Sequence, residues 1–287
     1  MLGCRRGFHG LWRGDIVELD SRSVSERLQY GGTFLMTARS QSFNTPEGVQ
    51  RAFDMCKVFG IDALVVIGGD GSFRGALALA RLGLPVIGIP STIDNDIGCS
   101  DYTIGYDTAL NTAMEAIDRL RNTATSHERC SCIEVMGREA GYIALNVGIS
   151  CGAEVILIPE VEMDFDRHVV RRLLECRNKG KYHYIVVVAE GAANTAEISA
   201  RIEAETGIES RVTILGHLQR GGSPTVRDRL MASHMGVLAI QNLASGEYGK
   251  VVAYQRGRVI SLEIEEALRM EKRISQEEID LAYNLAL

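Results

Sequence analysis

The feature that most constrains this chain is a repeated alternation of short apolar runs and amphipathic segments, joined by few residues. The apolar runs Ile61–Ile67 and Leu84–Ile89 flank a segment of helical character that begins at Ser72 and ends before Gly83. Strand, helix and strand with short joints are typical of a right-handed parallel unit. The sequence therefore predicts an α/β fold with mainly parallel sheets. Further strands are expected at Cys130–Met136, Glu154–Ile158, Tyr184–Ala189 and Arg211–Leu215.

Other local signals mark the ends of elements. Thr45-Pro46 predicts a helix start, because threonine caps the first turn and proline suits the first helical position. A long helix is expected from Ser223-Pro224 to about Ser245, followed by a hairpin and two terminal helices. Met1 to Leu19 is the least regular stretch, and only its end resembles a strand. No flexible linker is present in the 287 residues, so any two domains must interdigitate.

Composition excludes several classes of partner. The net charge of −6 gives no general attraction to nucleic acid or to an anionic membrane surface. No run reaches the roughly 20 apolar residues of a membrane span, and the first residues lack a secretory apolar core. The seven cysteines are odd in number and mostly lie in apolar runs, which predicts buried thiols and a cytoplasmic location.

Two carboxylates follow the strand that ends at Ile89. Asp94 and Asp96 lie two residues apart, where ligands of α/β sheets collect. Phosphoryl transfer to an alcohol needs a base and a metal charge, and one acid can serve each task. The alternative is an aspartate-rich loop that binds its own backbone amides.

A glycine turn, Gly68-Gly69-Asp70-Gly71-Ser72, follows the preceding strand. Its glycines let the backbone approach an anion, the next helix offers free N–H groups, and Asp70 can hold a cation on that anion. This pattern predicts a phosphate and Mg²⁺ site. The alternative is a strand-to-helix turn that needs glycine only for its own geometry.

Arginines near strand ends supply the cations for a phosphorylated sugar. Each alone is equally compatible with an ordinary surface residue, and His217 alone with a hydrogen-bonded structural histidine. These arginines are Arg129, Arg138, Arg211 and Arg220. Separately, Arg39 follows the glycine turn Gly31-Gly32 and could reach a phosphate.

With these motifs in their observed order, the chain resembles the bacterial ATP-dependent 6-phosphofructokinase family, the phosphofructokinase A family. The resemblance extends from about Gly3 to the C-terminus. The motifs are Gly31-Gly32-Thr33-Phe34-Leu35 with Arg39, the glycine turn, Thr92-Ile93-Asp94-Asn95-Asp96, Met136-Gly137-Arg138, Pro159-Glu160 and Gly216-His217-Leu218-Gln219-Arg220-Gly221-Gly222-Ser223.

The resemblance implies two interleaved Rossmann-like α/β/α domains, each with three layers and a mainly parallel sheet. One, residues 1–105 with about 219–269, would bind ATP. The other, about 106–218 with 270–287, would bind fructose 6-phosphate. The reaction implied is transfer of the γ-phosphoryl group of ATP to the sugar's 1-hydroxyl, the committed step of glycolysis.

The family's functional residues map onto matching positions here. Asp94 would be the base, Asp70 would bind Mg²⁺, and Asp96, Thr92 and Arg138 would support the transfer. ATP would contact Arg39, Ser40, Gly69, Asp70, Gly71 and Ser72. The sugar phosphate would contact Thr92, Asp94, Met136, Gly137, Arg138, Glu190, His217 and Arg220, with Arg129 and Arg211 reaching it from a neighbouring subunit.

The same resemblance implies a homotetramer with active sites shared between subunits. A nucleotide such as ADP, or phosphoenolpyruvate, would bind at an effector site, although Ser21 stands where many relatives have an effector arginine. The matching effector residues are Arg121, Gly152, Glu154, Lys179 and Lys181.

Two departures leave alternatives open. Relative to the family, about thirty residues that form a strand, a glycine-rich phosphate turn and a helix are expected before this chain's first residue. Their lack favours a catalytically impaired fragment or a regulatory sugar-phosphate-binding chain as an alternative. Pyrophosphate-dependent relatives tend to carry an acid in place of Gly71 and a lysine in place of Ser91, so both residues favour ATP. Lipid and NAD kinases share only the glycine turn.

Overall fold

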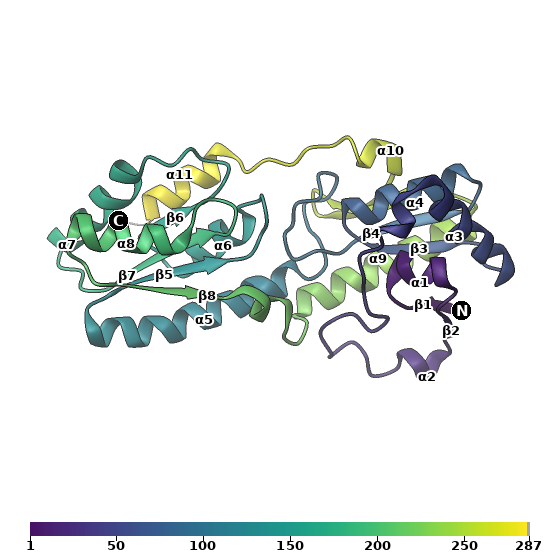
Figure 1. The fold of residues 1–287 in the computed structure, drawn as a ribbon, viewed down its shortest axis with the longest axis horizontal. Coiled ribbons are helices and arrows are strands. Elements are labelled where there is room, and N and C mark those ends of the chain that lie inside the picture. The colour runs from purple at the N-terminus through teal and green to yellow at the C-terminus, as the bar shows by residue number, and fades with distance from the viewer. Residues whose placement is uncertain (286–287) are drawn as a thin grey trace. The chain divides into compact units, whose positions relative to one another are not determined.

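The structure, a computed structural model, describes residues 1–285 and the side chains of all of these except 124 and 125. It divides into two compact units, whose elements Figure 1 labels. Unit 1 consists of Met1–Thr92, Ile97–Gly105 and Gly222–Lys272, and unit 2 of Ile93–Asp96, Tyr106–Gly221 and the segment from Arg273. The short segment with Asp94 and Asp96 thus belongs to unit 2, whereas the sequence-based boundaries place it in the first domain.

Unit 1 is built on a four-stranded sheet of order β10-β9-β4-β3. Strands β3 and β4 are parallel, β4 and β9 are parallel, and β9 and β10 form the expected antiparallel hairpin. Helix α4 covers one face with Phe73, Ala76 and Leu79, and α9 covers the other with Met235 and Ala239. The bounds are β3 (Leu64–Gly68), α4 (Asp70–Arg81), β4 (Val86–Pro90), α9 (Val226–Ala244), β9 (Lys250–Gln255), β10 (Arg258–Glu263) and α10 (Ile264–Ala267).

The first residues of unit 1 are more regular than the sequence suggests. Strands β1 (Leu2–Cys4) and β2 (Ile16–Glu18) pair antiparallel around helix α1 (Gly7–Arg13). One of the glycines that make this stretch look irregular serves close packing, because a Cβ added to Gly10 would lie 1.6 Å from the Arg5 carbonyl oxygen. The chain continues through α2 (Ser21–Val24), a 3₁₀ turn (Ser42–Asn44) and α3 (Pro46–Val58), which Thr45 caps as predicted.

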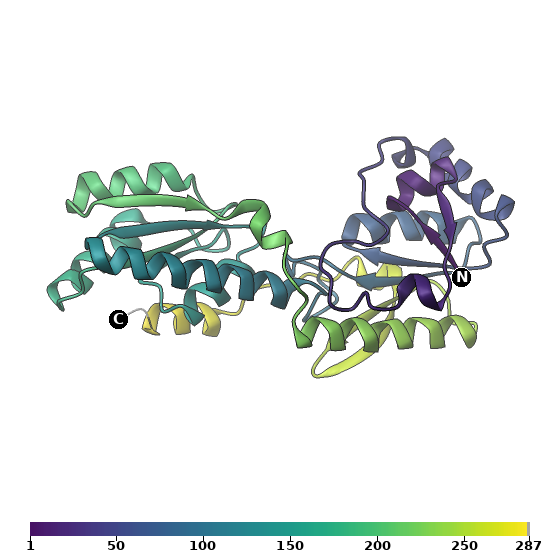
Figure 2. The same ribbon diagram turned by 90° about the horizontal axis from the view of Figure 1, so that it is seen from below.

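Unit 2 is built on a fully parallel sheet of order β6-β7-β5-β8. Cys130 and Cys132 of β5 face the core beneath α7 and α8. Helices α5 and α6 pack together against the other face of the sheet, and Figure 2 shows helices on both sides of the strands. Because helices cover both faces of the sheet, β6 and β7 are continuous apolar runs. The edge strand β8 is largely exposed and contains Arg211 and Thr213. The bounds are α5 (Tyr106–His127), β5 (Cys130–Val135), α6 (Tyr142–Ser150), β6 (Val155–Leu157), a π-helical turn η2 (Asp166–Val170), α7 (Arg171–Asn178), β7 (Tyr184–Ala189), α8 (Thr195–Thr206), β8 (Ser210–Ile214), the 3₁₀ helix η3 (Gly216–Arg220) and α11 (Gln276–Leu285).

Parallel strands between helical layers confirm the predicted fold class. All seven cysteines are free thiols, and five of them are buried. Burial raises the pKa of the Cys56 and Cys99 thiols to about 11, so these side chains act as small apolar groups rather than nucleophiles. Among the described helices, none has the length and apolar character needed to cross a bilayer.

Candidate active site

The predicted base, Asp94, belongs to unit 2 and is almost completely buried. Its side chain is 1% exposed, and its Oδ2 lies 3.2 Å from Nε of Arg138, whose own side chain is 59% exposed. A buried carboxylate is stable only with partners that replace its lost hydration. Asp96, two residues later, is exposed. The two acids therefore differ in environment, as a base and a supporting charge would.

The turn after β5 is held by side chains from the ends of two neighbouring strands. Glu190, directly after β7, accepts hydrogen bonds from the backbone N–H groups of Gly137 and Arg138 through the same Oε1, at 3.1 and 2.7 Å. Gln219, after β8, accepts one from the N–H of Met136 at 2.8 Å. Arg138 has φ 54°, a left-handed conformation that non-glycine residues rarely adopt. These bonds hold it there, facing Asp94.

Two basic residues on η3 are available to bind an anion. His217 and Arg220 are exposed, and within the described part of the chain neither side chain has a hydrogen-bond or ion-pair partner. They follow β8, the strand that pairs with β5. The structure thus gathers Met136, Gly137, Arg138, Glu190, His217 and Arg220, with Asp94, into one cluster at the carboxyl ends of β5, β7 and β8, which we name the strand-end cluster.

Arg129 and Arg211 do not join the strand-end cluster. They lie at the opposite, amino ends of β5 and β8, and both form ion pairs with Glu209. The Nε of Arg129 lies 2.8 Å from its carboxylate. The hydrogen bond from Arg129 lowers the pKa of Glu209. These arginines therefore form a cationic pair of their own, remote from the other predicted sugar-phosphate residues of the same unit.

The glycine turn of unit 1 has an open front. A Cβ added at Gly69 or Gly71 would meet no atom within 4 Å, whereas one at Gly68 would lie 2.4 Å from Ser72 Oγ. Helix α4 starts at Asp70, with Gly69 as N-cap, and so begins two residues before Ser72, the residue expected to cap it. Asp70 therefore sits in the first turn, where unpaired N–H groups favour anions.

The carboxylate of Asp70 is suited to bind a cation that is also bound by the phosphates of a substrate. Burial raises the pKa of its carboxyl, an effect that the charge of Arg74 opposes. Within the described residues, no three His, Cys, Asp or Glu side chains form a ready metal cage. Mg²⁺ in kinases is typically bound by one or two carboxylates together with substrate phosphates, which matches a single acid beside an open turn.

The remaining residues predicted to face ATP differ in their contacts. Arg39 is exposed, and Ser40 Oγ accepts a hydrogen bond from the N–H of Phe43, so this serine also shapes the local turn. Thr92, which is predicted to support the transfer and to contact the sugar phosphate rather than ATP, lies just after β4. Its carbonyl accepts a hydrogen bond from Thr103 Oγ1 at 2.6 Å, which fixes the backbone there.

Four of the five predicted effector residues lie together in unit 2. Arg121 donates to the carbonyl of Cys151, next to Gly152. The buried Glu154 accepts from Lys181 Nζ at 2.9 Å and from the backbone N–H of Ile185 at 2.6 Å. Lys179 is exposed at the end of α7, and among the described residues its side chain has no hydrogen bond or ion pair with the other four.

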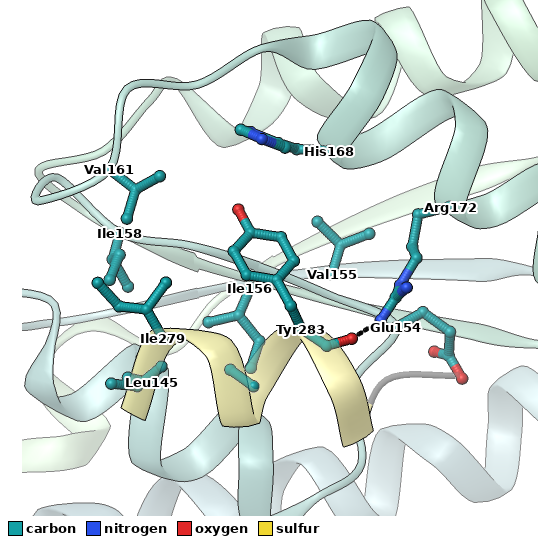
Figure 3. Close-up of a pocket in the computed structure, with 11 residues that line it drawn as sticks. Leu145, Glu154, Val155, Ile156, Ile158, Val161, His168, Arg172, Ile279 and Tyr283 are labelled. Atoms are coloured by element: carbon teal, nitrogen blue, oxygen red, sulfur yellow. Dashed lines mark hydrogen bonds between the residues drawn. The ribbon is translucent and has the colours of Figure 1, made fainter. Parts of the chain in front are cut away.

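A pocket beside Glu154 has a different character, as Figure 3 shows. It encloses about 420 Å³ of empty space, its open mouth included. Its walls are mostly apolar side chains of α6, β6 and α11, and Arg172 donates to the carbonyl of Tyr283 at one end. Glu154 is the one predicted site residue among those that line it.

Sequence reasoning missed one residue that supports the strand-end cluster from behind. Gln219 is buried and hydrogen-bonded to the turn after β5, and the sequence alone gives it no role. The available signal was its position between His217 and Arg220 in a block rich in polar residues. That signal does not separate a ligand contact from a structural one, because only the structure shows which way the amide points.

Comparison with known proteins agrees with these features. The sequence profile of the phosphofructokinase family matches residues 1–243. A Clostridium botulinum protein named ATP-dependent 6-phosphofructokinase is 50% identical over 282 residues, which are 98% of this chain and 88% of the relative. A Clostridium tetani protein of the same name is 48% identical, with 100% and 89% covered.

Solved structures show the same fold. Phosphofructokinase from Saccharomyces cerevisiae matches with a TM-score of 0.88 at 31% identity, over 99% of this chain but only 43% of the yeast chain. A pyrophosphate-dependent phosphofructokinase from Marinobacter aquaeolei matches with a TM-score of 0.83 at 21% identity, which shows the fold alone. By its sequence profile and by its identity to relatives over nearly its whole length, this chain belongs to the phosphofructokinase family.

Proposed function

We propose that this chain transfers the γ-phosphoryl group of ATP to the 1-hydroxyl of fructose 6-phosphate, giving fructose 1,6-bisphosphate and ADP, with Asp94 as the base. The observation that carries the role of Asp94 is its burial against Arg138, 3.2 Å away. A base in this position is fixed before the sugar arrives, which lowers the entropy cost of proton transfer. Family membership and the names of the close relatives support the reaction.

In this scheme Asp94 takes the proton of the 1-hydroxyl, and the hydroxyl oxygen forms a bond to the γ-phosphorus. The bond between that phosphorus and the bridging oxygen breaks, and its electron pair leaves with ADP. Arg138 offsets negative charge on the transferring group. Mg²⁺, held by Asp70 and the phosphates, would supply charge compensation on the donor. Asp96 and Thr92 would support the transfer, as Arg138 does. The nucleotide would contact Arg39, Ser40 and the turn Gly69–Ser72.

The strand-end cluster suits a phosphorylated sugar. His217 and Arg220 have no competing partners within residues 1–285 and can bind the 6-phosphate directly. Met136, Gly137 and Glu190 shape the wall beside them. We assign Arg129 and Arg211 to the site of a neighbouring subunit in a homotetramer, because they lie at the opposite ends of their strands.

A mixing experiment tests the shared site. Arg211→Ala should raise KM for fructose 6-phosphate about tenfold or more, the loss expected for one charged hydrogen bond, and change kcat little. Unfolded together and refolded with Asp94→Asn subunits, these chains should form some sites with wild-type KM, since each supplies what the other lacks. A mixture that shows only the raised KM would place Arg211 outside the neighbour's site.

The preference for ATP over pyrophosphate as the phosphoryl donor is proposed to depend on Gly71. A side chain there meets open space, so Gly71→Asp should fold normally. The new carboxylate would repel the nucleotide phosphates, and we expect KM for ATP to rise about tenfold or more while KM for fructose 6-phosphate stays unchanged. Gly71→Ala, which adds bulk without charge, is the matched control. Equal effects of the two substitutions would show that space, not charge, matters.

Two further features complete the proposal. Arg121, Gly152, Glu154, Lys179 and Lys181 would bind a nucleotide such as ADP, or phosphoenolpyruvate, as an effector. The seven free thiols fit work in the reducing cytoplasm. The runner-up reading is a pyrophosphate-dependent enzyme; the ATP-dependent names of relatives at 48–50% identity favour the first.

A further inference from the structure

One residue of η3 differs from its neighbours. Gln219 is 1% exposed, whereas His217, Leu218 and Arg220 around it are all exposed. In a 3₁₀ helix, successive side chains point about 120° apart, so one of them can turn inward while the others face solvent. The inward position here is taken by an amide rather than by an apolar group.

The amide is only half satisfied. Its Oε1 accepts the hydrogen bond from Met136 N–H, but Nε2 is buried without a partner among residues 1–285. A buried donor without an acceptor is unfavourable for folding, so Nε2 offsets part of the stability that the Oε1 hydrogen bond contributes. The net gain in stability from glutamine is therefore small, and the acceptor oxygen is the functional part of this side chain.

That oxygen completes the support of the turn after β5. The three successive N–H groups of Met136, Gly137 and Arg138 each donate to a side chain, the first to Gln219 and the other two to Glu190. Gln219 is the link that also joins this turn to the helix carrying His217 and Arg220. It adds a side-chain link between the two walls of the strand-end cluster, beside the β5–β8 ladder and the hydrogen bond from Leu215 N–H to the Glu134 carbonyl.

We infer that Gln219 is a positioning residue, which sets the spacing between the Met136–Arg138 turn and the His217–Arg220 helix and thereby the affinity for the sugar phosphate. This inference rests on the proposed function of the same cluster. Gln219 touches neither the reacting atoms nor solvent, so it acts only through the residues on either side of it.

The test compares the full-length wild type with Gln219→Met. The substitution removes one unpaired donor, Nε2, and creates another, Met136 N–H, so Tm without ligand should change by only a few degrees. KM for fructose 6-phosphate should rise about tenfold, and the Tm increase that this sugar phosphate produces should shrink. The value of kcat should stay within about threefold, because Glu190 still accepts the hydrogen bond from the backbone N–H of Arg138 and keeps this residue facing Asp94.

Two companion variants sharpen the result. Gln219→Glu keeps an oxygen acceptor at the same reach and should restore KM toward the wild-type value. Leu218→Met, an exposed neighbour on η3, should leave every measured quantity unchanged. An unaltered KM in folded Gln219→Met, a loss confined to kcat, or failure of this variant to fold would each overturn the inference, the last because it would show a purely structural role.

Failure of the proposed function would look different. In that case the wild type itself would give no fructose 1,6-bisphosphate. Titration calorimetry with fructose 6-phosphate still separates the two questions, since weaker binding by Gln219→Met than by wild type supports the positioning role without any turnover. Equal binding by both proteins would overturn it.

Discussion

Asp94→Asn should lower kcat by at least about 10²-fold, the low end for a positioned general base, while fructose 6-phosphate binding stays close to normal. The amide has nearly the same size and can still accept a hydrogen bond from Arg138 Nε, so the buried site keeps its shape. It cannot take a proton from the 1-hydroxyl. Steady-state kinetics would give kcat, and titration calorimetry would give the sugar-phosphate affinity independently of turnover.

Asp96→Asn is the matched control, because it makes the same chemical change two residues away on an exposed side chain. Its effect on kcat should be at least tenfold smaller than that of Asp94→Asn. Near-normal turnover by Asp94→Asn, or equal losses in the two variants, would remove Asp94 from the role of base.

Arg138→Leu should also lower kcat strongly, by about 10²-fold to 10³-fold, the range observed when one preorganised charge-stabilising donor is lost. The guanidinium that lies 3.2 Å from Asp94 is the same group that would offset charge on the phosphoryl group. Arg138→Lys retains the charge without the planar, multidentate geometry. Its kcat should lie between that of the wild type and that of Arg138→Leu.

Measuring kcat and KM separately for each Arg138 variant distinguishes a role in the transition state from a role in binding the substrate. Loss of an interaction made mainly in the transition state lowers kcat and kcat/KM together. If Arg138→Leu instead raised KM for fructose 6-phosphate with kcat unchanged, Arg138 would be a ground-state binding residue and the proposed role in transfer would be wrong. Thermal denaturation of each variant controls for misfolding.

The regular part of the fold could be predicted because its signals are local. A continuous apolar run marks β7, whose residues are all buried, and Thr45-Pro46 marks the start of α3. The start of α4 was misplaced by two residues, since glycine as an N-cap has no side chain that would mark it. Helix α1 is not predicted because its two glycines resemble a loop in sequence, although one of them, Gly10, is required by close packing against Arg5.

The site was predictable in its residue types and order but not in its pairings. Spacing placed Asp94 after a strand, yet nothing local indicated that Arg138, some forty residues on, would be its partner. Likewise, Glu190 and Gln219 come from different strand ends and meet at one turn only through the register of β5, β7 and β8. Long-range register is a property of the sheet rather than of any segment.

The most direct test of the account is to incubate the purified chain with fructose 6-phosphate, Mg²⁺ and ATP and to identify the products by ³¹P NMR. We expect a second phosphate ester on C1 of the sugar and one ADP for each fructose 1,6-bisphosphate, with no sugar product when pyrophosphate replaces ATP. Product formed from pyrophosphate alone, or no bisphosphate from either donor with folded protein, would contradict the proposed function.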